Sequence, residues 1–419
     1  MAQQPARFDV AISGASYAGM ALACALADAL GDELRIALID RAAPPAATSG
    51  HQSNHAHDAR AFALSAASRH LLQAIGVWDS IAHAAQPVTG IELTDSPLDA
   101  GVRPVLLRYD NVTGDGEAAT HIVPAHLLAD ALRARLAAHP SITLLAPANA
   151  TGFTASDATA TVQLADGREI NAALVIAADG RKSTLRDAAN IKLIGWDYAQ
   201  TGIVTTVQHA HPHEGRAVQH FLPGGPFAIL PLTGNRACIT WSEDAREAAR
   251  ILALDDDGFL REVEKRFGGR LGAITLEGPR QSWPLSMHLA RSYVAQRFAL
   301  IGDAAHGVHP IAGQGLNLGL RDVAALTEAV ADNMRLGFDA GDALALRRYE
   351  RWRRFDSAVS TATFDGINRL FSSDATLLRS AREFGLGVVD RIPALKRFFV
   401  EEAAGLTGAV PKLLRGKRV

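Results

Sequence analysis

Gly14, Ser16 and Gly19 have the types and spacing of a turn that binds the pyrophosphate of a nucleotide. An apolar run precedes the turn, and an alanine-rich segment with helical character follows it. The first glycine permits a tight turn, a small middle residue lets the backbone approach the phosphates, and the last glycine lets the helix pack on the sheet. Free N–H groups at the helix start then point at the ligand. Asp40, about 20 residues further on, is placed to accept hydrogen bonds from ribose hydroxyls.

The same turn has two other interpretations. A strand, a Gly-x-Ser turn and a helix also describe a nucleophile elbow, in which the serine attacks a carbonyl carbon. An elbow normally has glycine two residues after the serine, where this chain has Ala18, and it needs Asp and His partners that the sequence does not identify. The turn could also be purely structural. The spacing to Asp40 favours a nucleotide site.

A second segment of this kind is "VIAADGRKSTLR" (175–186). Its apolar strand ends at Asp179 and Gly180, and a helix starts at Ser183. An ordinary strand-to-helix loop with an N-cap would have the same pattern, so this motif alone does not identify a site.

A third segment, "ALIGDAAHGVHPIAGQGLNLGLRDVAAL" (299–326), is harder to explain without a ligand. A buried strand ends at Asp303, a loop with Pro310 follows, and a helix begins near Leu316. The start of that helix contains three glycines, at 313, 315 and 319. Glycine costs backbone entropy in a helix, so its repeated use here indicates that the backbone must closely approach a flat ligand.

Apolar patterning predicts the elements that position these motifs. Strands are expected at 10–13, 34–40, 142–145, 160–164, 174–177 and 298–303, and helices at 18–30, 63–75, 123–136 and from 316 onward. Residues 202–285 alternate between apolar and polar side chains, which is typical of an antiparallel sheet, with one helix near 259–267.

The predicted fold class is mixed α/β (α+β). We expect a Rossmann-like nucleotide-binding domain, an inserted antiparallel-sheet domain that holds the substrate, and a helical C-terminal region. The expected bounds are 1–75, 120–200 and 290–335 for the first, 76–119 and 201–289 for the second, and 336–419 for the third.

Composition and charge exclude several classes of function. The net charge of the 419 residues is −2, so no basic field indicates nucleic acid as a partner. Cys24 and Cys238 lie far apart without metal or redox spacing, as in a reducing cytoplasm. The N-terminus has no apolar signal segment, and no apolar run reaches the roughly 20 residues that span a bilayer. We expect a cytoplasmic globular protein.

Two groups of histidines raise the question of a metal site: His51, His55 and His57, and His209, His211 and His213. On a strand, the alternating second group would lie on one side, as metal ligands require. Pro212 interrupts that strand, and the sequence offers no evident supporting residues. We expect an exposed loop and no metal, with metal binding as the open alternative.

Together the motifs resemble those of a known family. The order of nucleotide turn, Asp-Gly motif and Gly-Asp motif resembles the flavoprotein monooxygenases of the p-hydroxybenzoate hydroxylase superfamily. Three segments are most similar to its ubiquinone-biosynthesis hydroxylase branch: "DARAFALSAASRHLLQAIGVWDSI" (58–81), "GDAAHGVHPIAGQGLNLGLRD" (302–322) and "NRLFSSDATLLRSAREFGLGVVDRIPALKRFFVEEAAG" (368–405). The likeness extends over nearly the whole chain, and the combination is more specific than any one motif.

The resemblance implies FAD as the cofactor and assigns residues to it. The implied FAD-binding residues are Gly14, Ser16, Gly19, Asp40, Arg41, Arg60, His126, Asp179, Gly180, Asp303, Gly315, Leu316 and Asn317. The loop expected over the flavin ring contains Pro310, Gly313 and Gln314, and no acid–base pair is assigned. Two positions depart from the family pattern. Ser16 replaces a glycine, which would weaken FAD retention, and His126 stands where the family commonly has an arginine.

Among these, four residues have specific implied roles. Asp40 holds the adenosine ribose, and Arg60 lies beside the cofactor. Asp179 is expected near both FAD and the pyridine nucleotide, and Asp303 at the ribityl or phosphate region.

The implied reaction is an aromatic hydroxylation. NAD(P)H reduces the flavin, the reduced flavin captures O2 as a C4a-hydroperoxide, and the distal oxygen attacks an electron-rich phenol. The implied substrate is a polyprenylated phenol on the way to ubiquinone. The alternatives are a hydroxylase of a small soluble aromatic and a weakly active FAD-binding scaffold in a quinone-biosynthesis complex. Candidates for the substrate side, each equally suited to a plain sheet core, are Phe221, Pro223, Phe227, Leu230 and Pro231.

A polyprenyl tail would lie in a bilayer, so the protein must approach a membrane. The C-terminal segment "IPALKRFFVEEAAGLTGAVPKLLRGKRV" (392–419) mixes apolar with basic residues and has no acid after Glu402. Apolar side chains at the interface and basic ones at anionic headgroups are the usual pairing for peripheral attachment. We expect contact with the inner membrane through this segment, with a packed terminal helix as the alternative.

Overall fold

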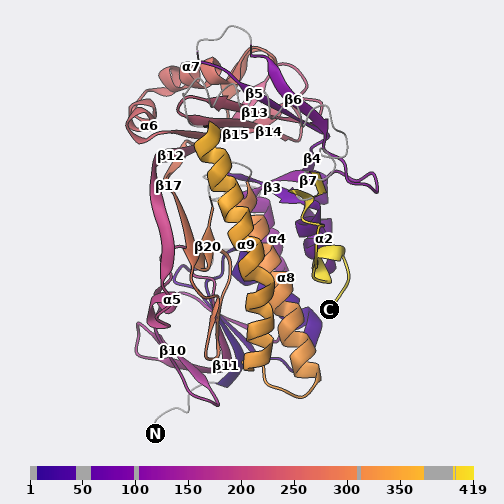
Figure 1. Cartoon of the computed structure of the whole chain (residues 1–419), viewed down its shortest axis with the longest axis vertical. Helices are drawn as coiled ribbons and strands as arrows, with labels where there is room; N and C mark the ends of the chain where they lie inside the picture. Colours follow the sequence, from indigo (N-terminus) through magenta and orange to yellow (C-terminus); the bar gives the residue numbers. More distant parts are fainter. Residues whose placement is uncertain (1–6, 44–57, 99–102, 309–312, 372–399, 402) are drawn as a thin grey trace.

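The computed structural model describes residues 7–43, 58–98, 103–308, 313–371, 400–401 and 403–419. Figure 1 shows an elongated molecule with a large β-sheet toward each end and two long helices running alongside. A third, three-stranded sheet lies between the two large ones.

The eight-stranded sheet has the N-terminal strand at its centre. Its main path is β18 (Val294–Ala295), β19 (Phe298–Leu300), β11 (Glu169–Ala177), β1 (Arg7–Ser13), β2 (Ile36–Ile39) and β8 (Ile142–Leu145). Neighbours from β19 to β8 are parallel, so their carboxyl ends meet at one edge. Beyond β11 the sheet continues antiparallel with β10 (Ala160–Leu164) and β9 (Ala150–Ala155). The expected Rossmann-like architecture is confirmed.

The helix that joins β1 to β2 is α1 (Tyr17–Leu30), and its residues 19–27 are all buried. It packs against the sheet and against α8 (Gln314–Arg335). A helix without a polar face belongs in the interior of a protein, and small alanine side chains let its neighbours approach closely. The predicted β-α-β unit over the first forty residues is therefore confirmed.

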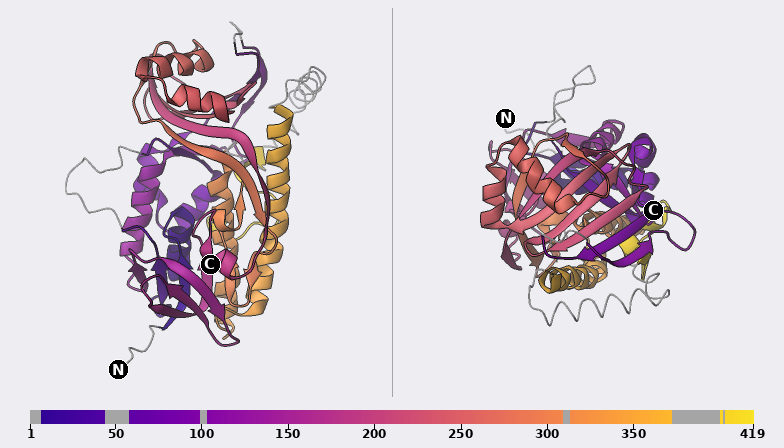
Figure 2. Two further views of the ribbon diagram at one scale, coloured as in Figure 1. Left: turned by 90° about the vertical axis from the view of Figure 1, so that its left-hand side faces the viewer. Right: turned by 90° about the horizontal axis from the view of Figure 1, so that it is seen from above.

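The nine-stranded sheet is largely antiparallel, as its alternating sequence predicts. Its main path is β20 (His306–Gly307), β17 (Gln281–Ala290), β12 (Leu193–His209), β15 (Arg236–Asp244), β14 (Gly225–Leu232), β13 (Arg216–Leu222), β5 (Gly90–Asp95) and β6 (Val105–Asp110), with β16 (Ile274–Leu276) beside β12. The long strands β12 and β17 run from this sheet toward the other end of the molecule (Figure 2). One face is covered by α6 (Ala245–Leu252) and α7 (Asp256–Phe267). The domain bounds stay a prediction.

The three-stranded sheet differs from the sequence-based expectation. It consists of β3 (Ala61–Ser65), β7 (Thr120–Pro124) and β4 (Gln86–Pro87). Helices were expected from 63 and from 123, but Phe62 pairs with Val123 in the ladder, and α2 (Ala66–Ala74) and α4 (Ala125–Ala137) begin only after these strands. Pairing between distant segments overrides the helical pattern at these helix starts. Two other short helices, α3 (Trp78–Ile81) and α5 (Thr184–Ala188), follow turns.

The C-terminal part contains α8, α9 (Ala343–Phe371) and a short turn of helix, η5 (Leu413–Arg415). Leu413 and Leu414 are buried in the main core, where η5 packs against α2. Both leucines belong to the segment 392–419, which we expected to contact a membrane with its apolar residues. For these two that expectation is wrong, because they are buried in the core. Residues 392–399 of the same segment lie outside the described residues. None of the described helices is both long enough and apolar enough to cross a membrane.

Candidate functional site

The first glycine turn is sterically tight. Gly14 has a φ of +107°, and a Cβ there would lie 2.3 Å from the carbonyl oxygen of Ala178 on the next strand's end. A Cβ on Gly19 would lie 1.9 Å from the carbonyl oxygen of Gly14. The turn is fixed to its neighbours, because Gly14 N–H donates to Ile39 O at 2.7 Å. Both glycines are therefore required by the backbone geometry, as the motif predicts.

Ser16 is the N-cap residue of α1, but its side chain caps no backbone N–H. The side chain is exposed, and the described residues provide no hydrogen-bond partner for its hydroxyl. A nucleophile elbow needs a histidine next to the serine. Among the described residues, no histidine forms a hydrogen bond with Ser16. The first turn of α1 also carries no acidic residue that would compete with an anionic ligand.

Asp40 lies directly after β2 and joins that strand to the glycine turn. Its Oδ2 accepts the N–H of Ala15 at 2.6 Å, and its Oδ1 accepts the N–H of Ala42 at 2.8 Å. A carboxylate has about four acceptor positions, so capacity for ribose hydroxyls is left. Asp40 thus also shapes the turn, a role that its spacing did not reveal. The neighbouring Arg41 is exposed.

Asp179 carries a buried acceptor at the carboxyl end of β11. Its Oδ2 accepts the N–H of Leu185 at 3.5 Å, but its Oδ1 is buried and has no partner among the described residues. Burial raises the pKa of the Asp179 carboxyl above its usual range. The next residue, Gly180, has a φ of +85° and no described atom within 4 Å of the position of a Cβ. A buried oxygen without a donor has room to accept a hydrogen bond from a ligand or from a water molecule.

Gly302 and Asp303 form a turn that side chains of α8 and β17 hold. Gly302 has a φ of +57°, and its N–H donates to Oδ2 of Asp322 on α8 at 2.9 Å. The backbone carbonyl of Asp303 accepts a hydrogen bond from His288 on β17 at 2.8 Å. The side chain of Asp303 itself is exposed, which leaves its carboxylate available to a ligand.

The helix starts of α1 and α8 meet at this turn. A Cβ on Gly319 would lie 3.4 Å from Cα of Gly302, and one on Gly302 would lie 3.4 Å from Cβ of Ala18. The first and third motifs, far apart in sequence, therefore approach each other so closely that a side chain on either glycine would fill the space between them. Strand ends of a parallel sheet, with helix starts beside them, are the general binding place of nucleotides in such folds.

The N-cap residue of α8 has a left-handed backbone conformation, and the first turn of the helix is only partly covered by other described residues. Gly313 is its N-cap residue with a φ of +61°, and a Cβ there would lie 3.2 Å from Cβ of Ala63. Gln314 and Leu316 are half-buried, and no described atom lies within 4 Å of a Cβ built on Gly315. Pro310, which was expected in the same loop, lies outside the described residues.

Asn317 differs from its expected role. Its side chain is 1% exposed; Oδ1 accepts from Ser65 N at 2.9 Å and from Ser68 Oγ at 2.7 Å, and Nδ2 donates to Ala63 O at 2.8 Å. The amide therefore binds β3 and α2 rather than a flavin. The Asn317 side chain thus fixes the start of α8, and a contact of its backbone with FAD stays a prediction.

A bidentate ion pair lies beside the site. Arg60 Nε and Nη2 donate to the two carboxylate oxygens of Asp58 at 2.9 and 2.8 Å. Burial alone would raise the pKa of Asp58, but the paired Arg60 outweighs it and holds that pKa below its usual range. Asp303 contributes to the field that raises the pKa of Arg60, and His126 at the start of α4 acts on Asp58. The structure thus brings together three of the predicted site residues, and it adds Asp58.

The five predicted substrate-side residues do not share one face of the nine-stranded sheet. Phe227 is fully buried against Trp241 and α7, and Pro231 follows it on the same side of β14. The expectation for these two is wrong, because α6 and α7 cover their face. Leu230 packs on the opposite face, toward β3, and alternation along β13 places Phe221 there as well.

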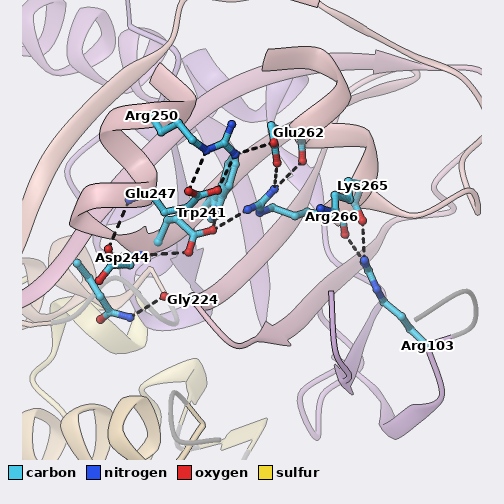
Figure 3. Close-up of polar contacts among 11 residues, drawn as sticks. Arg103, Gly224, Trp241, Asp244, Glu247, Arg250, Glu262, Lys265 and Arg266 are labelled. Atoms are coloured by element: carbon cyan, nitrogen blue, oxygen red, sulfur yellow. Dashed lines mark hydrogen bonds and ion pairs between the residues drawn. The ribbon is translucent and has the colours of Figure 1, made fainter. Parts of the chain in front are cut away.

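Pro223 lies exposed in the turn between β13 and β14, which a polar network supports (Figure 3). Gln200 donates to Gly224 O in this turn at 3.0 Å. Glu243 lies beneath Gly224 and accepts from Trp241 Nε1 at 3.2 Å and from Arg266 at 2.9 Å. The network fixes the turn from the side of the sheet core.

The second histidine group makes hydrogen bonds with the backbone. His209 Nδ1 lies 2.8 Å from His211 O, and His213 Nε2 lies 2.7 Å from Leu232 O. His213 Nδ1 accepts the N–H of Gly215 at 2.9 Å. The first histidine group, His51, His55 and His57, lies outside the described residues.

Comparisons with known proteins agree with this geometry. A family model described as "FAD binding domain" matches residues 7–359. The chain is 41% identical to the ubiquinone hydroxylase UbiL of Rhodospirillum rubrum, over 97% of this chain and 92% of that protein. It is 32% identical to the 3-demethoxyubiquinol 3-hydroxylase of Escherichia coli, over 97% and 100%.

A solved structure with the same fold is that of p-nitrophenol 4-monooxygenase PnpA from Pseudomonas putida. The TM-score is 0.76, with 17% identity, and the match covers 96% of this chain and 99% of that one. At that identity the likeness concerns the fold alone. The matched family model and the two relatives identify more than the fold. The chain belongs to the FAD-binding monooxygenase family, in the branch that contains the ubiquinone hydroxylases.

Proposed function

We propose that this chain hydroxylates a polyprenylated phenol in ubiquinone biosynthesis, with FAD as bound cofactor, NAD(P)H as electron donor and O2 as co-substrate. The observation that carries the proposal is the close approach of Ala18, Gly302 and Gly319, which brings two glycine-bearing motifs together at one sheet edge. The names of the relatives at 41% and 32% identity support the substrate class.

The residues present at this edge fit FAD. A pyrophosphate would accept hydrogen bonds from the free N–H groups at the start of α1, next to Gly14. A ribose would donate to Asp40, and a further hydroxyl would satisfy the unpartnered Oδ1 of Asp179. The flavin ring would lie against the open backbone around Gly315, and Asp303 would bind the chain that links ring and phosphates.

Bound FAD supplies the redox chemistry, because it carries electrons from NAD(P)H to O2. The protein supplies orientation and electrostatics. Free N–H groups at the start of α8 favour negative charge beside Gly313, and the first turn of that helix holds no acidic residue. Arg60, held in one orientation by Asp58, adds a fixed positive charge near Asp303.

The substrate would enter between the nine-stranded sheet and β3. Leu230 packs on this face with Ala61 and Ala63, close to the start of α8. Phe221 lies on the same face of the sheet by alternation. These apolar side chains would exclude water from the reacting ring, and the supported turn at Pro223 would border the entrance.

The proposal is tested with purified protein and defined substrates. Flavin absorbance establishes FAD retention, and NAD(P)H oxidation is measured with prenylated phenols and with small phenols that lack the tail. We expect oxidation coupled to a hydroxylated product only with the prenylated substrates. Hydroxylation of small phenols alone would favour the small-aromatic alternative. FAD binding without turnover would favour a scaffold. Complementation of strains blocked at each hydroxylation step then identifies the ring position.

A polyprenylated substrate also requires that the protein work at a membrane. We propose a protein of the cytoplasm that contacts the inner membrane peripherally and meets other quinone-biosynthesis proteins there. Leu413 and Leu414 cannot provide that contact, because they lie in the core. The apolar contribution must come from other residues, and residues 392–399 of the C-terminal segment lie outside those that the structure describes.

A further inference from the structure

The helix α9 has an unusual outer face. Phe355 is 78% exposed and Leu344 is 61% exposed, and Val359 is also exposed. Large apolar side chains with this exposure, gathered on one helix, mark an interaction surface more often than isolated ones do. Figure 1 shows α9 on the outside of α8, running from the level of the eight-stranded sheet to the nine-stranded sheet. Both views of Figure 2 place it at one side of the described fold.

The same face carries three arginines without acidic partners. Arg347, Arg351 and Arg354 are exposed, and no described carboxylate forms an ion pair with them. The two acidic residues of the helix whose side chains are described, Glu350 and Asp356, make contacts within the fold. Glu350 accepts from Ser292 Oγ at 2.7 Å and from Tyr293 N at 2.9 Å. The outer face is therefore cationic, although the whole chain has a net charge of −2.

Asp356, the other acid in this part of the helix, is likewise used within the fold. It pairs with Arg353 and, at 3.2 Å, with Arg321 of α8. Arg348 also lies on the outer side, between Phe355 and Val359 by helical spacing, and its side chain is 41% exposed, but its charge is paired with Asp332 at 2.8 Å. The charges that the helix uses within the fold are thus paired, whereas the three arginines present theirs to the outside.

These outward residues form one continuous stripe. We define the α9 stripe as Leu344, Arg347, Arg351, Arg354, Phe355 and Val359. Their spacings of three and four residues place neighbours on the same side of a helix. At about 100° per residue, the arginines lie along one border of the stripe and the apolar residues along the other. This is the arrangement of a helix that lies in the plane of a membrane surface.

We infer that the α9 stripe binds an anionic phospholipid bilayer, with Phe355 and Leu344 entering the interface and the three arginines at the headgroups. A linear stripe along a helix can contact a plane along its whole length. A second copy of the chain is disfavoured as the occupant, because a two-fold axis would bring arginine-rich stripes together. The inference deepens the proposed function. It rests on that function in one respect, because a polyprenylated substrate is the reason for the protein to approach a membrane.

The test uses the full chain with FAD bound and two kinds of vesicle. One contains phosphatidylglycerol and the other only phosphatidylcholine, and co-sedimentation measures binding. Each arginine near an anionic surface contributes about fivefold to partitioning, so replacing Arg347, Arg351 and Arg354 by glutamine is expected to weaken binding about 100-fold. The matched control replaces three exposed cations on α6 and α7, Arg246, Arg261 and Lys265, and should bind like wild type.

Insertion is followed with a tryptophan at the stripe. Phe355→Trp should show a blue shift of its emission with phosphatidylglycerol vesicles and quenching by brominated lipid tails. Leu144→Trp, on the exposed edge strand β8, is the control and should show neither. Wild-type binding should weaken in 1 M salt, where the Debye length is about 3 Å.

Three results would overturn the inference. The first is unchanged vesicle binding by the triple arginine variant, and the second is equal loss in the control triple. The third is that the triple arginine variant differs from wild type in oligomeric state, measured by sedimentation velocity, while its vesicle binding is unchanged. That result would make the stripe a contact between copies. Hydroxylation of a detergent-dispersed prenylated phenol is measured in parallel. It needs no vesicle, so its failure in wild-type protein would concern the proposed function alone.

Discussion

The carboxylate of Asp322 accepts the N–H of Gly302 at 2.9 Å, and this contact fixes the Gly-Asp turn from behind. Asp322 is fully buried; His306 Nε2 lies 2.6 Å from its Oδ2, and Arg353 of α9 donates to its Oδ1 at 2.7 Å. The turn that would bind FAD is therefore connected through one carboxylate to the helix that carries the proposed membrane stripe. Asp322 positions the turn and does not itself face the ligand.

Asp322→Asn is expected to lower both stability and FAD affinity. Breaking a buried ion pair by removing one partner costs about 3–5 kcal/mol. The cost here should lie toward the lower end, because the buried Arg353 would lose Asp322 but keep its pair with Asp356. The free energy of unfolding from urea titration and the Kd for FAD are the measurements. Asp332→Asn, which disrupts the partly exposed pair with Arg348, should cost less than about 1 kcal/mol and leave the Kd unchanged.

Asp322→Asn should also change how the stability of the protein depends on pH. Burial would raise the pKa of Asp322, but facing His306 and Arg353 outweigh burial and lower it. A group with a depressed folded-state pKa adds stability that is present above its unfolded pKa of about 3.9 and is lost as pH falls through the folded value. Wild-type stability should therefore fall more steeply with acid than that of Asp322→Asn. Parallel acid limbs of the two curves would contradict the network.

The stability that Asp179 contributes should change with pH in the opposite direction to that of Asp322. Burial raises the pKa of Asp179, so its protonated form adds stability below the unfolded pKa of about 3.9, and that stability is lost as pH rises through the folded value. In FAD-free protein at neutral pH, Asp179→Asn is expected to unfold at a higher temperature than wild type. FAD should narrow that difference, because a ligand donor to Oδ1 would stabilise the carboxylate. If apo Asp179→Asn melted at a lower temperature than apo wild type, Asp179 Oδ1 would have a hydrogen-bond partner in the FAD-free protein.

Asp303→Ala separates binding from folding. The Asp303 side chain is exposed, and its carboxylate makes no hydrogen bond with the described residues. We expect the apoprotein's stability to change by less than about 0.5 kcal/mol. Losing a hydrogen bond to a charged group costs about 1.5–3 kcal/mol, so FAD should bind about 10- to 100-fold more weakly and be lost on purification. Asp40→Ala should weaken FAD binding and also destabilise the turn, since Asp40 holds Ala15 N–H. Unchanged FAD affinity in Asp303→Ala would place the site elsewhere.

The sequence predicted those parts of the site whose demands are local. Gly14 and Gly19 were identifiable from their spacing in the turn, and a side chain on Gly19 would clash with Gly14 O within the turn itself. Asn317 was assigned to FAD from the family resemblance, and the sequence did not indicate its side-chain bond with Ser65, because that partner is remote along the chain. The helix α6 was missed, although Asp244 and Glu247 have the spacing of a capping box at its start.

The errors in the nine-stranded sheet and at the C-terminus have one cause. Phe227 and Leu413 are apolar residues whose partners belong to distant elements, α7 and α2. An apolar side chain suits a substrate wall, a membrane and a core equally well by composition. Only the tertiary packing decides among them, and in both places the core was the outcome.

Ser16→Gly is expected to be tolerated. The Ser16 hydroxyl makes no cap to α1, and replacing a serine N-cap by glycine costs only a few tenths of a kcal/mol. The related family pattern has glycine here, so FAD affinity should stay the same or increase. Isothermal titration with FAD measures it. A tenfold weaker affinity would show that the hydroxyl contacts the cofactor directly.

Gly315→Ala gives the sharpest separation between protein and ligand. No described atom lies within 4 Å of a Cβ at this position, so the apoprotein should fold normally, and alanine in place of glycine within a helix should add up to about 1 kcal/mol of stability. If the flavin ring lies against this backbone, the same methyl group will occupy its place, and FAD affinity will fall by tenfold or more. Gly19→Ala is the contrasting variant, because its Cβ would meet Gly14 O at 1.9 Å and the apoprotein itself should be destabilised. Melting temperatures of both apoproteins and their Kd values for FAD complete the comparison. A stabilised Gly315→Ala protein with wild-type FAD affinity would move the ring away from the start of α8.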